Sequence, residues 1–230
     1  MALIRPGGLV GQISGRLGGD VFAHGRYGQY VRAGSNPVTS TTSYALAAKA
    51  KLTQSTQAWQ GLTAAQKLSW KVWAETNPTL NRLGQSVTLT GHAAYVGSFC
   101  RATAAGIGAL TDPPVAAAPA GLATLSLTGD IGLGDVSAVY TATPLGANDH
   151  LWLEACVLDS TGINFVENYL RHIGTSGAAQ ASPYIFEALV TARFGTLQVG
   201  QILVTEISVI NGVTKQRSAP LRAQVAITTT

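Results

Sequence analysis

The first 43 residues combine many glycines with apolar side chains, and this combination limits what they can fold into. Glycines recur four residues apart, at Gly7, Gly11, Gly15 and Gly19, and five more occur by residue 34. Glycine loses more backbone entropy on folding than any other residue, so this stretch gains little by folding alone. Its apolar side chains would nevertheless be more stable buried than exposed to water. We therefore expect residues 1–35 to form an extended arm that is buried against another protein chain.

Arginines and apolar residues alternate along this arm, and both kinds of side chain are expected to contact a partner. The arginines would pair with carboxylates of neighbouring subunits, since a guanidinium binds a carboxylate through two parallel hydrogen bonds. The apolar side chains would fill grooves or add a strand to the edge of a sheet. The expected partner-binding residues are Ile13, Arg16, Leu17, Phe22, Arg26, Tyr27, Tyr30 and Arg32.

Charged residues make up only 11% of the chain, against about 25% in a typical soluble protein. Hydrophobic residues make up 46%, and there are 26 glycines. A soluble monomer normally carries more surface charge, so we expect neighbouring subunits to cover much of this surface. The alternative is a β protein that is rich in small residues.

The net charge of +4 conceals a difference between the two halves of the chain. Residues 1–111 contain ten Lys or Arg and two acids, whereas residues 112–230 contain five Lys or Arg and nine acids. Such a split indicates different partners for the two halves. The basic half would face nucleic acid or an acidic protein surface. Because its basic residues are scattered and match no nucleic-acid-binding motif, nucleic acid is not the expected partner.

The two cysteines and the apolar runs indicate the kind of cellular compartment in which the protein folds. Cys100 and Cys156 fall in what read as different domains, so we expect neither a disulfide nor a metal site, which fits a reducing compartment. Pro6 and Gly7 interrupt the apolar residues at the N-terminus, so no signal peptide is expected. No run of about 18 apolar residues occurs, so no membrane span is expected.

Composition divides the chain into four predicted segments. They are an extended Gly/Arg-rich arm over 1–35, a helical platform over 36–105, a Pro/Ala/Gly linker over 106–121 and a β-sandwich over 122–230. Asn36-Pro37 marks the first boundary, because the residue before a proline avoids the helical region. Three prolines would make the linker semi-rigid, and the charge balance changes sign there.

Three helices are expected in the platform, over 43–59, from Thr63 onward and over 91–105 with Thr90 as its cap. Thr63 and Gln66 form a capping box, which opens the second helix. The predicted apolar face of that helix comprises Leu68, Trp70, Val72 and Trp73. The tryptophans of this region indicate a helical hairpin with an aromatic core.

From Leu122 onward, apolar residues alternate with polar ones and turn residues recur, which predicts β structure. The predicted strands span 122–128, 136–142, 150–158, 163–172, 184–190, 201–210 and 219–227. Seven short strands in about 110 residues are typical of an immunoglobulin-like sandwich, and without a bridging cysteine pair the fibronectin-like form fits better. Trp152 would fill the core between the sheets. The expected fold class is α+β, with an extended N-terminal arm, a small helical segment and a C-terminal immunoglobulin/fibronectin-like β-sandwich.

No constellation of catalytic residues is visible in the sequence. The four histidines lack metal-ligand spacing. Asp149 and His150, adjacent on a strand, would point to opposite faces. The glycines of residues 15–19 lack the Gly-Lys-Ser/Thr ending of a phosphate-binding loop. We therefore expect no enzyme and no catalytic, cofactor-binding or metal-binding residue.

A longer motif begins with Gly11-Gln-Ile-Ser-Gly-Arg-Leu-Gly-Gly-Asp20 and continues to Tyr30-Val-Arg32. It resembles the opening of a family of phage and prophage proteins. These proteins begin with Gly/Ser-Gly-Arg/Lys-Leu-Gly-Gly, followed by an aromatic residue and Tyr-Val-Arg. The similarity extends to Trp59-Gln-Gly-Leu-Thr-Ala-Ala-Gln66 and to Thr90-Gly-His-Ala-Ala-Tyr95, so it covers about the first 100 residues. The resemblance implies a virion-associated protein.

The arm, the low charge and the resemblance together predict a non-enzymatic structural protein of a bacteriophage, located in the virion and assembled in the host cytoplasm. It would clamp neighbouring phage structural proteins as a homo-oligomer or lattice-bound component, either capsid-associated (a decoration protein) or part of the head–tail region. One alternative is a tail-associated receptor- or glycan-binding module that uses the sandwich loops, with Tyr184 and Phe194 as its aromatic candidates. Another is a basic arm that binds nucleic acid inside a capsid, with strong salt dependence.

Overall fold

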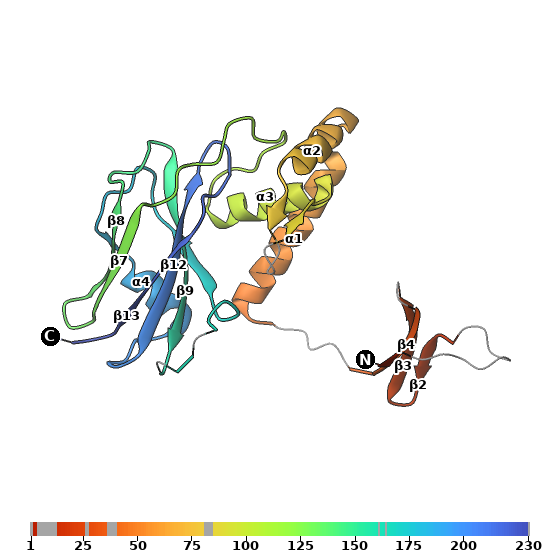
Figure 1. Ribbon diagram of the computed structural model, residues 1–230, viewed down its shortest axis with the longest axis horizontal. Coiled ribbons are helices and arrows are strands. Elements are labelled where there is room, and N and C mark those ends of the chain that lie inside the picture. The colour runs from red at the N-terminus through yellow and green to blue at the C-terminus, as the bar shows by residue number, and fades with distance from the viewer. Residues whose placement is uncertain are drawn as a thin grey trace. The chain divides into compact units, whose positions relative to one another are not determined.

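In the computed structural model, the described residues are 2–3, 13–25, 28–35, 41–80, 85–160, 162–163 and 165–229. The chain divides into two compact units, residues 1–47 and residues 48–230 (Figure 1). Helices and antiparallel sheets both occur, so the predicted α+β class is confirmed.

The first unit contains an antiparallel four-stranded sheet with the strand order β1-β4-β3-β2. Its strands are β1 (Ala2–Leu3), β2 (Gly15–Leu17), β3 (Asp20–Gly25) and β4 (Gly28–Ala33). Gly18 and Gly19 connect β2 to β3, and Gly18 has a φ of +60°, which glycine adopts without strain. The sequence predicts an extended arm here. In the described residues the backbone pairs with itself instead, because hairpins satisfy its N–H and C=O groups locally.

Three helices follow, α1 (Ser43–Gly61), α2 (Ala64–Thr76) and α3 (Gly91–Ala104), with the short strands β5 (Thr79–Leu80) and β6 (Ser86–Val87) between the last two. The capping box is confirmed. The Thr63 hydroxyl accepts from the N–H of Gln66 at 3.3 Å, and the Gln66 side chain accepts from the N–H of Thr63 at 3.1 Å. Thr90 caps α3 by accepting from the N–H of Ala93 at 3.2 Å, as predicted.

An aromatic core joins the helices. Trp70 is fully buried, and its ring lies 5.4 Å from that of Tyr95 at an interplanar angle of 83°. Leu62, Ala74 and Ala94 complete the buried cluster. The prediction that Leu68 and Val72 share the apolar face with Trp70 is wrong, because these two side chains are 61% and 51% exposed. Residues two apart do not face the same side of a helix, so α2 buries one apolar stripe and exposes another.

Residues 106–121, the predicted linker, contain no helix or strand but are attached to α2 at one end. The indole N–H of Trp70 donates to the carbonyl oxygen of Thr111 at 2.8 Å. The side-chain amide of Gln66 donates to Asp112 at 3.4 Å, and Leu110 packs against the aromatic core. These contacts hold the start of the segment against the helices.

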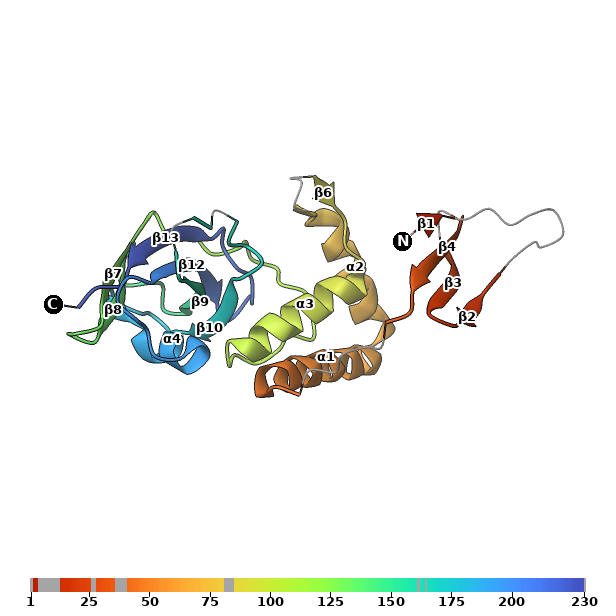
Figure 2. The same ribbon diagram turned by 90° about the horizontal axis from the view of Figure 1, so that it is seen from below.

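The remainder of the second unit contains two antiparallel sheets, with the strand orders β10-β9-β12-β13 and β11-β8-β7 (Figure 2). The strands are β7 (Thr124–Asp130), β8 (Asp135–Thr141), β9 (Asp149–Leu158), β10 (Arg171–Thr175), β11 (Tyr184–Ile185), β12 (Ile202–Asn211) and β13 (Leu221–Ala226). Both sheets contribute to one hydrophobic core. Its buried members include Val136 and Tyr140 of β8, Leu151 and Leu153 of β9, and Leu203 and Ile207 of β12.

Three predictions for this region are wrong. Residues 167–169 form a turn, so β10 begins only at Arg171 and the predicted strand over 163–172 does not form. The strand predicted over 184–190 is limited to β11, and the helix α4 (Glu187–Phe194) follows it and buries Val190 in the core. Trp152 is buried outside that core, because alternate residues of a strand face opposite sides and Leu151 and Leu153 occupy the core side.

Candidate functional site

The first unit carries the predicted partner-binding residues, and its strand register places three of them on one face. Arg16 of β2 lies opposite Val21 of β3, which lies opposite Arg32 of β4. Tyr30 pairs with Ala23 and therefore projects to the same side. Both arginines are exposed. Two guanidinium groups thus flank a short apolar strip.

The opposite face of this sheet carries two more of the predicted residues. Phe22 of β3 pairs with Gly15 and Val31, and Leu17 pairs with Asp20. Phe22 is half-buried, whereas Leu17 is 75% exposed. Ile13 is half-buried and precedes β2. The predicted contacts at Arg26 and Tyr27 lie outside the described residues.

The described part of the first unit contains no fully buried apolar side chain. Gln29 is its one buried residue, and Val21, Ala23 and Val31 are half-buried. A two-sided sheet without a covering layer leaves both faces accessible, so this unit has apolar surface available for a partner on each side.

The arginines of this unit have no carboxylate partner among the residues that the structure describes. Arg16 donates from Nε to the carbonyl oxygen of Gly18 at 3.2 Å. Asp20, the nearest acid in the sequence, lies on the other face of the sheet. The face that holds Arg16 and Arg32 can therefore bind carboxylates of another chain through charge-assisted hydrogen bonds.

A charged network that sequence reasoning missed lies on the non-core face of the four-stranded sheet in the second unit. Glu154, Glu206 and Arg222 stand side by side on β9, β12 and β13. Arg217 lies 3.1 Å from Glu154 and 3.9 Å from Glu206, and Arg222 lies 2.9 Å from Glu206. The sequence carries one signal for this network, because Glu154 and Glu206 each interrupt an otherwise apolar strand pattern. Each carboxylate of this network has a cationic partner.

His172 and Trp152 lie beside this network. Their ring centroids are 3.9 Å apart, and the indole N–H of Trp152 donates to Glu154 at 2.9 Å. Burial lowers the pKa of His172 to about 4, against the opposing attraction of Glu154. The imidazole is therefore neutral near pH 7 and contributes aromatic packing to this face.

The adjacent residues Asp149 and His150 have separate structural partners. Asp149 accepts from the side chain of Asn211 at 2.7 Å, while Nδ1 of His150 lies 3.0 Å from the carbonyl oxygen of Ser176. Cys100 and Cys156 are free thiols, and burial raises the pKa of Cys156. Among the described residues, no three His, Cys, Asp or Glu side chains are grouped to hold a metal ion. Nor is any described helix long and apolar enough to cross a bilayer.

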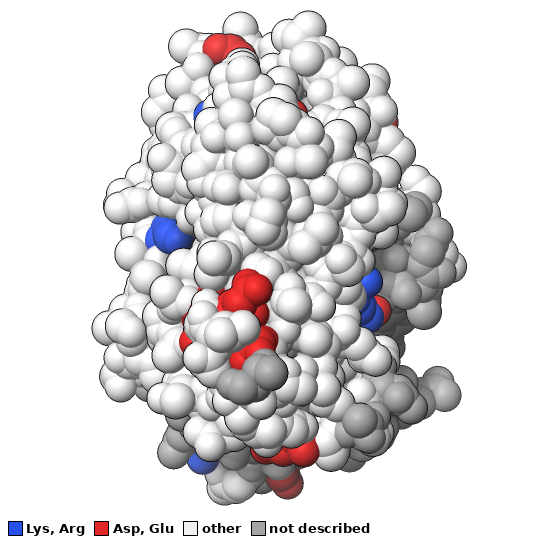
Figure 3. All heavy atoms as spheres, turned by 90° about the vertical axis from the view of Figure 1, so that its left-hand side faces the viewer, with Lys and Arg blue, Asp and Glu red and all other residues white. Residues whose placement is uncertain are grey.

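Surface charge is sparse where it can be seen over the second unit. Figure 3 shows a face in which uncharged residues predominate, with a group of acidic side chains and few basic ones. No model of a known protein family matches the chain, and neither does any curated protein.

Proposed function

We propose that this chain is a non-enzymatic structural protein of a bacteriophage virion, which clamps neighbouring subunits through its first unit. The observation that carries the proposal is the absence of a buried apolar side chain from the described part of that unit. A sheet of this kind gains its stability when another surface covers it. The protein would be assembled in the host cytoplasm and would act in the particle.

The two faces of the first unit suit different parts of a partner surface. Arg16 and Arg32 would pair with carboxylates, and Leu17 and Phe22 on the other face would enter apolar grooves. The exposed stripe of α2, with Leu68 and Val72, offers further apolar surface in the second unit. Many such contacts repeated around a ring or lattice would hold the protein without a catalytic site.

We further propose that the two sheets of the second unit form an immunoglobulin/fibronectin-like β-sandwich, with the helices as its platform. Their antiparallel order and shared core support this assignment. Together with the phage-like motif of the first 100 residues, the clamping unit favours the head surface or the head–tail region over the distal tail.

Sedimentation velocity on the full chain tests the clamping role. We expect a defined oligomer for the natural chain and a monomer for the double variant Leu17→Glu/Phe22→Glu, because two carboxylates would be buried in the contact. Leu133→Glu is the control, since Leu133 is 76% exposed in the second unit and should leave the oligomer intact. Equal sedimentation of the natural chain and the double variant would contradict the proposal.

A second candidate function, receptor or glycan binding, is favoured by one observation. The segment between β9 and β10 exposes Phe165 and Tyr169, which are 60% and 53% accessible. Of the predicted candidates, Tyr184 fits this role less well, because it is half-buried and stacks on Phe186, whereas Phe194 is 37% exposed. A glycan array would test it. Binding should be lost in Phe165→Ala/Tyr169→Ala and kept in Leu133→Glu, and absence of binding by the natural chain would reject it.

A further inference from the structure

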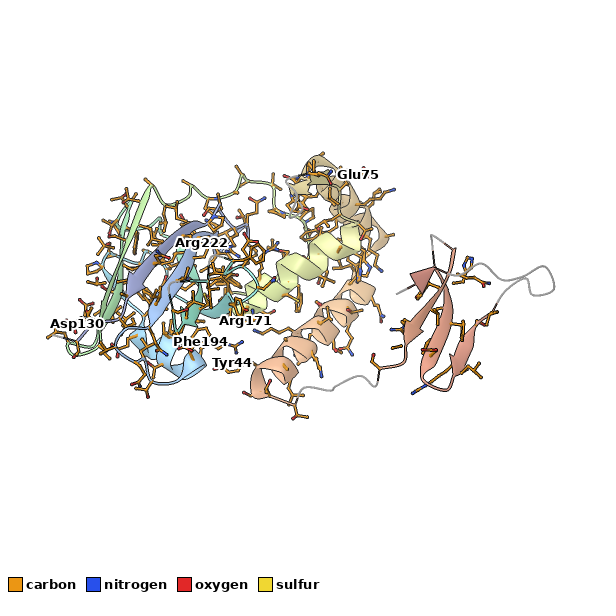
Figure 4. All side chains as sticks on the ribbon, turned by 60° about the horizontal axis from the view of Figure 1, so that its bottom comes forward. Tyr44, Glu75, Asp130, Arg171, Phe194 and Arg222 are labelled. Carbon is orange, nitrogen blue, oxygen red and sulfur yellow. The ribbon has the colours of Figure 1, made fainter. Side chains whose placement is uncertain are left out.

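A cleft of about 720 Å³ lies within the second unit, between the helical segment and the charged face of the sheet. Trp73, Pro78 and Arg101 line it from the helical side, and Glu154, Gln216 and Arg217 line it from the sheet side. Figure 4 shows the side chains of this region, with Arg171 and Arg222 labelled on the same sheet. Its size lies within the range of ligand-binding clefts.

The guanidinium of Arg101 is the first unusual feature of this cleft. It carries five N–H donors, yet it makes no hydrogen bond or ion pair within the described part of the chain, and its Nε is fully buried. Burial lowers the pKa of Arg101, and the positive charge of Arg217 adds to this effect. Leaving a buried N–H donor such as this Nε without an acceptor costs free energy.

Gln216 supplies a second unpartnered group in the same cleft. Its side-chain carbonyl oxygen Oε1 is fully buried and accepts no hydrogen bond from any described residue. Buried acceptors of this kind are nearly always satisfied in folded proteins. The wall of the cleft therefore contains an unpaired cationic side chain and an unpaired neutral acceptor, and the Gln216 amide must turn toward the cleft for its oxygen to meet a ligand.

The carboxylates of the cleft are already committed to other partners. Glu154 accepts from Arg217 at 3.1 and 3.3 Å, and Glu206 pairs with Arg222 at 2.9 Å. What is missing is thus a carboxylate for Arg101 and an N–H donor for Gln216, next to the apolar surface of Trp73 and Pro78. An acidic side chain with its peptide N–H meets both requirements, whereas a simple anion meets only the first.

We propose that this cleft binds an acidic peptide segment of a neighbouring protein, with a carboxylate on Arg101 and a backbone N–H on Gln216 Oε1. The inference rests on the structural role proposed above and names the chemistry of one partner. The clamping contact of the first unit and this cleft would be two separate attachment points of one chain.

Calorimetric titration of the full chain with capped tetraglutamate tests the proposal, with capped tetraglutamine and inorganic phosphate as comparison probes. We expect saturable binding of tetraglutamate, at least tenfold tighter than that of either comparison probe. Arg101→Gln should weaken it at least tenfold. Arg171→Gln removes the same charge from an exposed arginine on β10 and should change it less than twofold. Equal weakening by both variants, or phosphate binding as tight as tetraglutamate, would overturn the proposal.

Gln216→Leu keeps the test decisive if Arg101→Gln fails to fold. This variant removes the acceptor and leaves the charge, so it should weaken tetraglutamate severalfold and leave phosphate unchanged. Unaltered tetraglutamate binding in Gln216→Leu would contradict the backbone contact. Sedimentation of the Leu17→Glu/Phe22→Glu variant reports on the first unit alone, so failure of the cleft and failure of the clamping role are distinguishable.

Discussion

His172 links the stability of the second unit to pH. Its pKa in the folded chain is lowered from 6.5 to about 4, chiefly by burial. Lys51 and Arg217 lower it further, and Glu154 opposes them. As the pH falls below about 6.5, the unfolded chain binds a proton at this site and the folded chain does not. Stability from the neutral ring is therefore present above about pH 6.5 and is lost as the pH approaches 4.

We predict that His172→Phe reduces the loss of stability between pH 6.5 and 4, because it keeps a ring against Trp152 and removes the titrating group. Urea unfolding midpoints across this range measure the effect. An identical dependence in His172→Phe and the natural chain would refute the assignment.

Trp70 is the residue on which the helical core depends most. It is fully buried, packs on Tyr95 and donates a hydrogen bond to Thr111. Trp70→Ala should lower the free energy of unfolding by about 3–5 kcal/mol, as expected for the loss of a large buried ring. Leu68→Ala on the exposed stripe of the same helix should change it by about 0.5 kcal/mol or less. Comparable losses in chemical denaturation would mean that the two sides of α2 are assigned wrongly.

At the scale of elements, α2 and α3 approach closely at Gly91. A Cβ added there would lie 2.7 Å from the backbone N and 2.9 Å from the Cα of Lys71. Backbone atoms cannot move aside, so Gly91→Ala must separate the helices, at a cost of about 1–3 kcal/mol. Gly97→Ala is the matched control in the same helix, since its Cβ would meet only the flexible end of Arg101 at 3.4 Å. Thermal unfolding should show a lower Tm for Gly91→Ala alone.

Local signals predicted the elements that local interactions form. The side chains of Thr63 and Thr90 hydrogen-bond within four residues, so their helix starts were readable from the sequence. α4 was missed because a short run such as Glu187-Ala-Leu-Val190 is compatible with either a strand or a helix. In the structure, this run forms a helix that buries Val190 in the core to which both sheets contribute.

Long-range pairing set the features that could not be predicted. Arg217 reaches Glu154 across 63 residues, and no local pattern announces that contact. The sequence of α2 contains two apolar stripes and does not show which of them is buried. In the structure, Tyr95 packs against the stripe that contains Trp70. In the first unit, the division of the predicted contact residues between two faces follows from strand register, which no local pattern specifies.

At the scale of the whole molecule, the two units differ in how they are stabilised. The second unit has an aromatic core among its helices and an apolar core to which both of its larger sheets contribute. The described part of the first unit has polar and glycine-rich strands without such a core. Our central claim is that the first unit is completed by a neighbouring subunit, which makes its order depend on assembly.

Amide hydrogen exchange on separated monomer and oligomer fractions tests this claim most directly. We predict that amides of residues 13–25 and 28–35 are protected in the oligomer and exchange nearly freely in the monomer, because only assembly covers their sheet. Amides of β9 and β12 serve as the internal control and should be protected equally in both fractions. Equal protection of these two segments in monomer and oligomer would contradict the claim and would make the first unit an independently stable sheet.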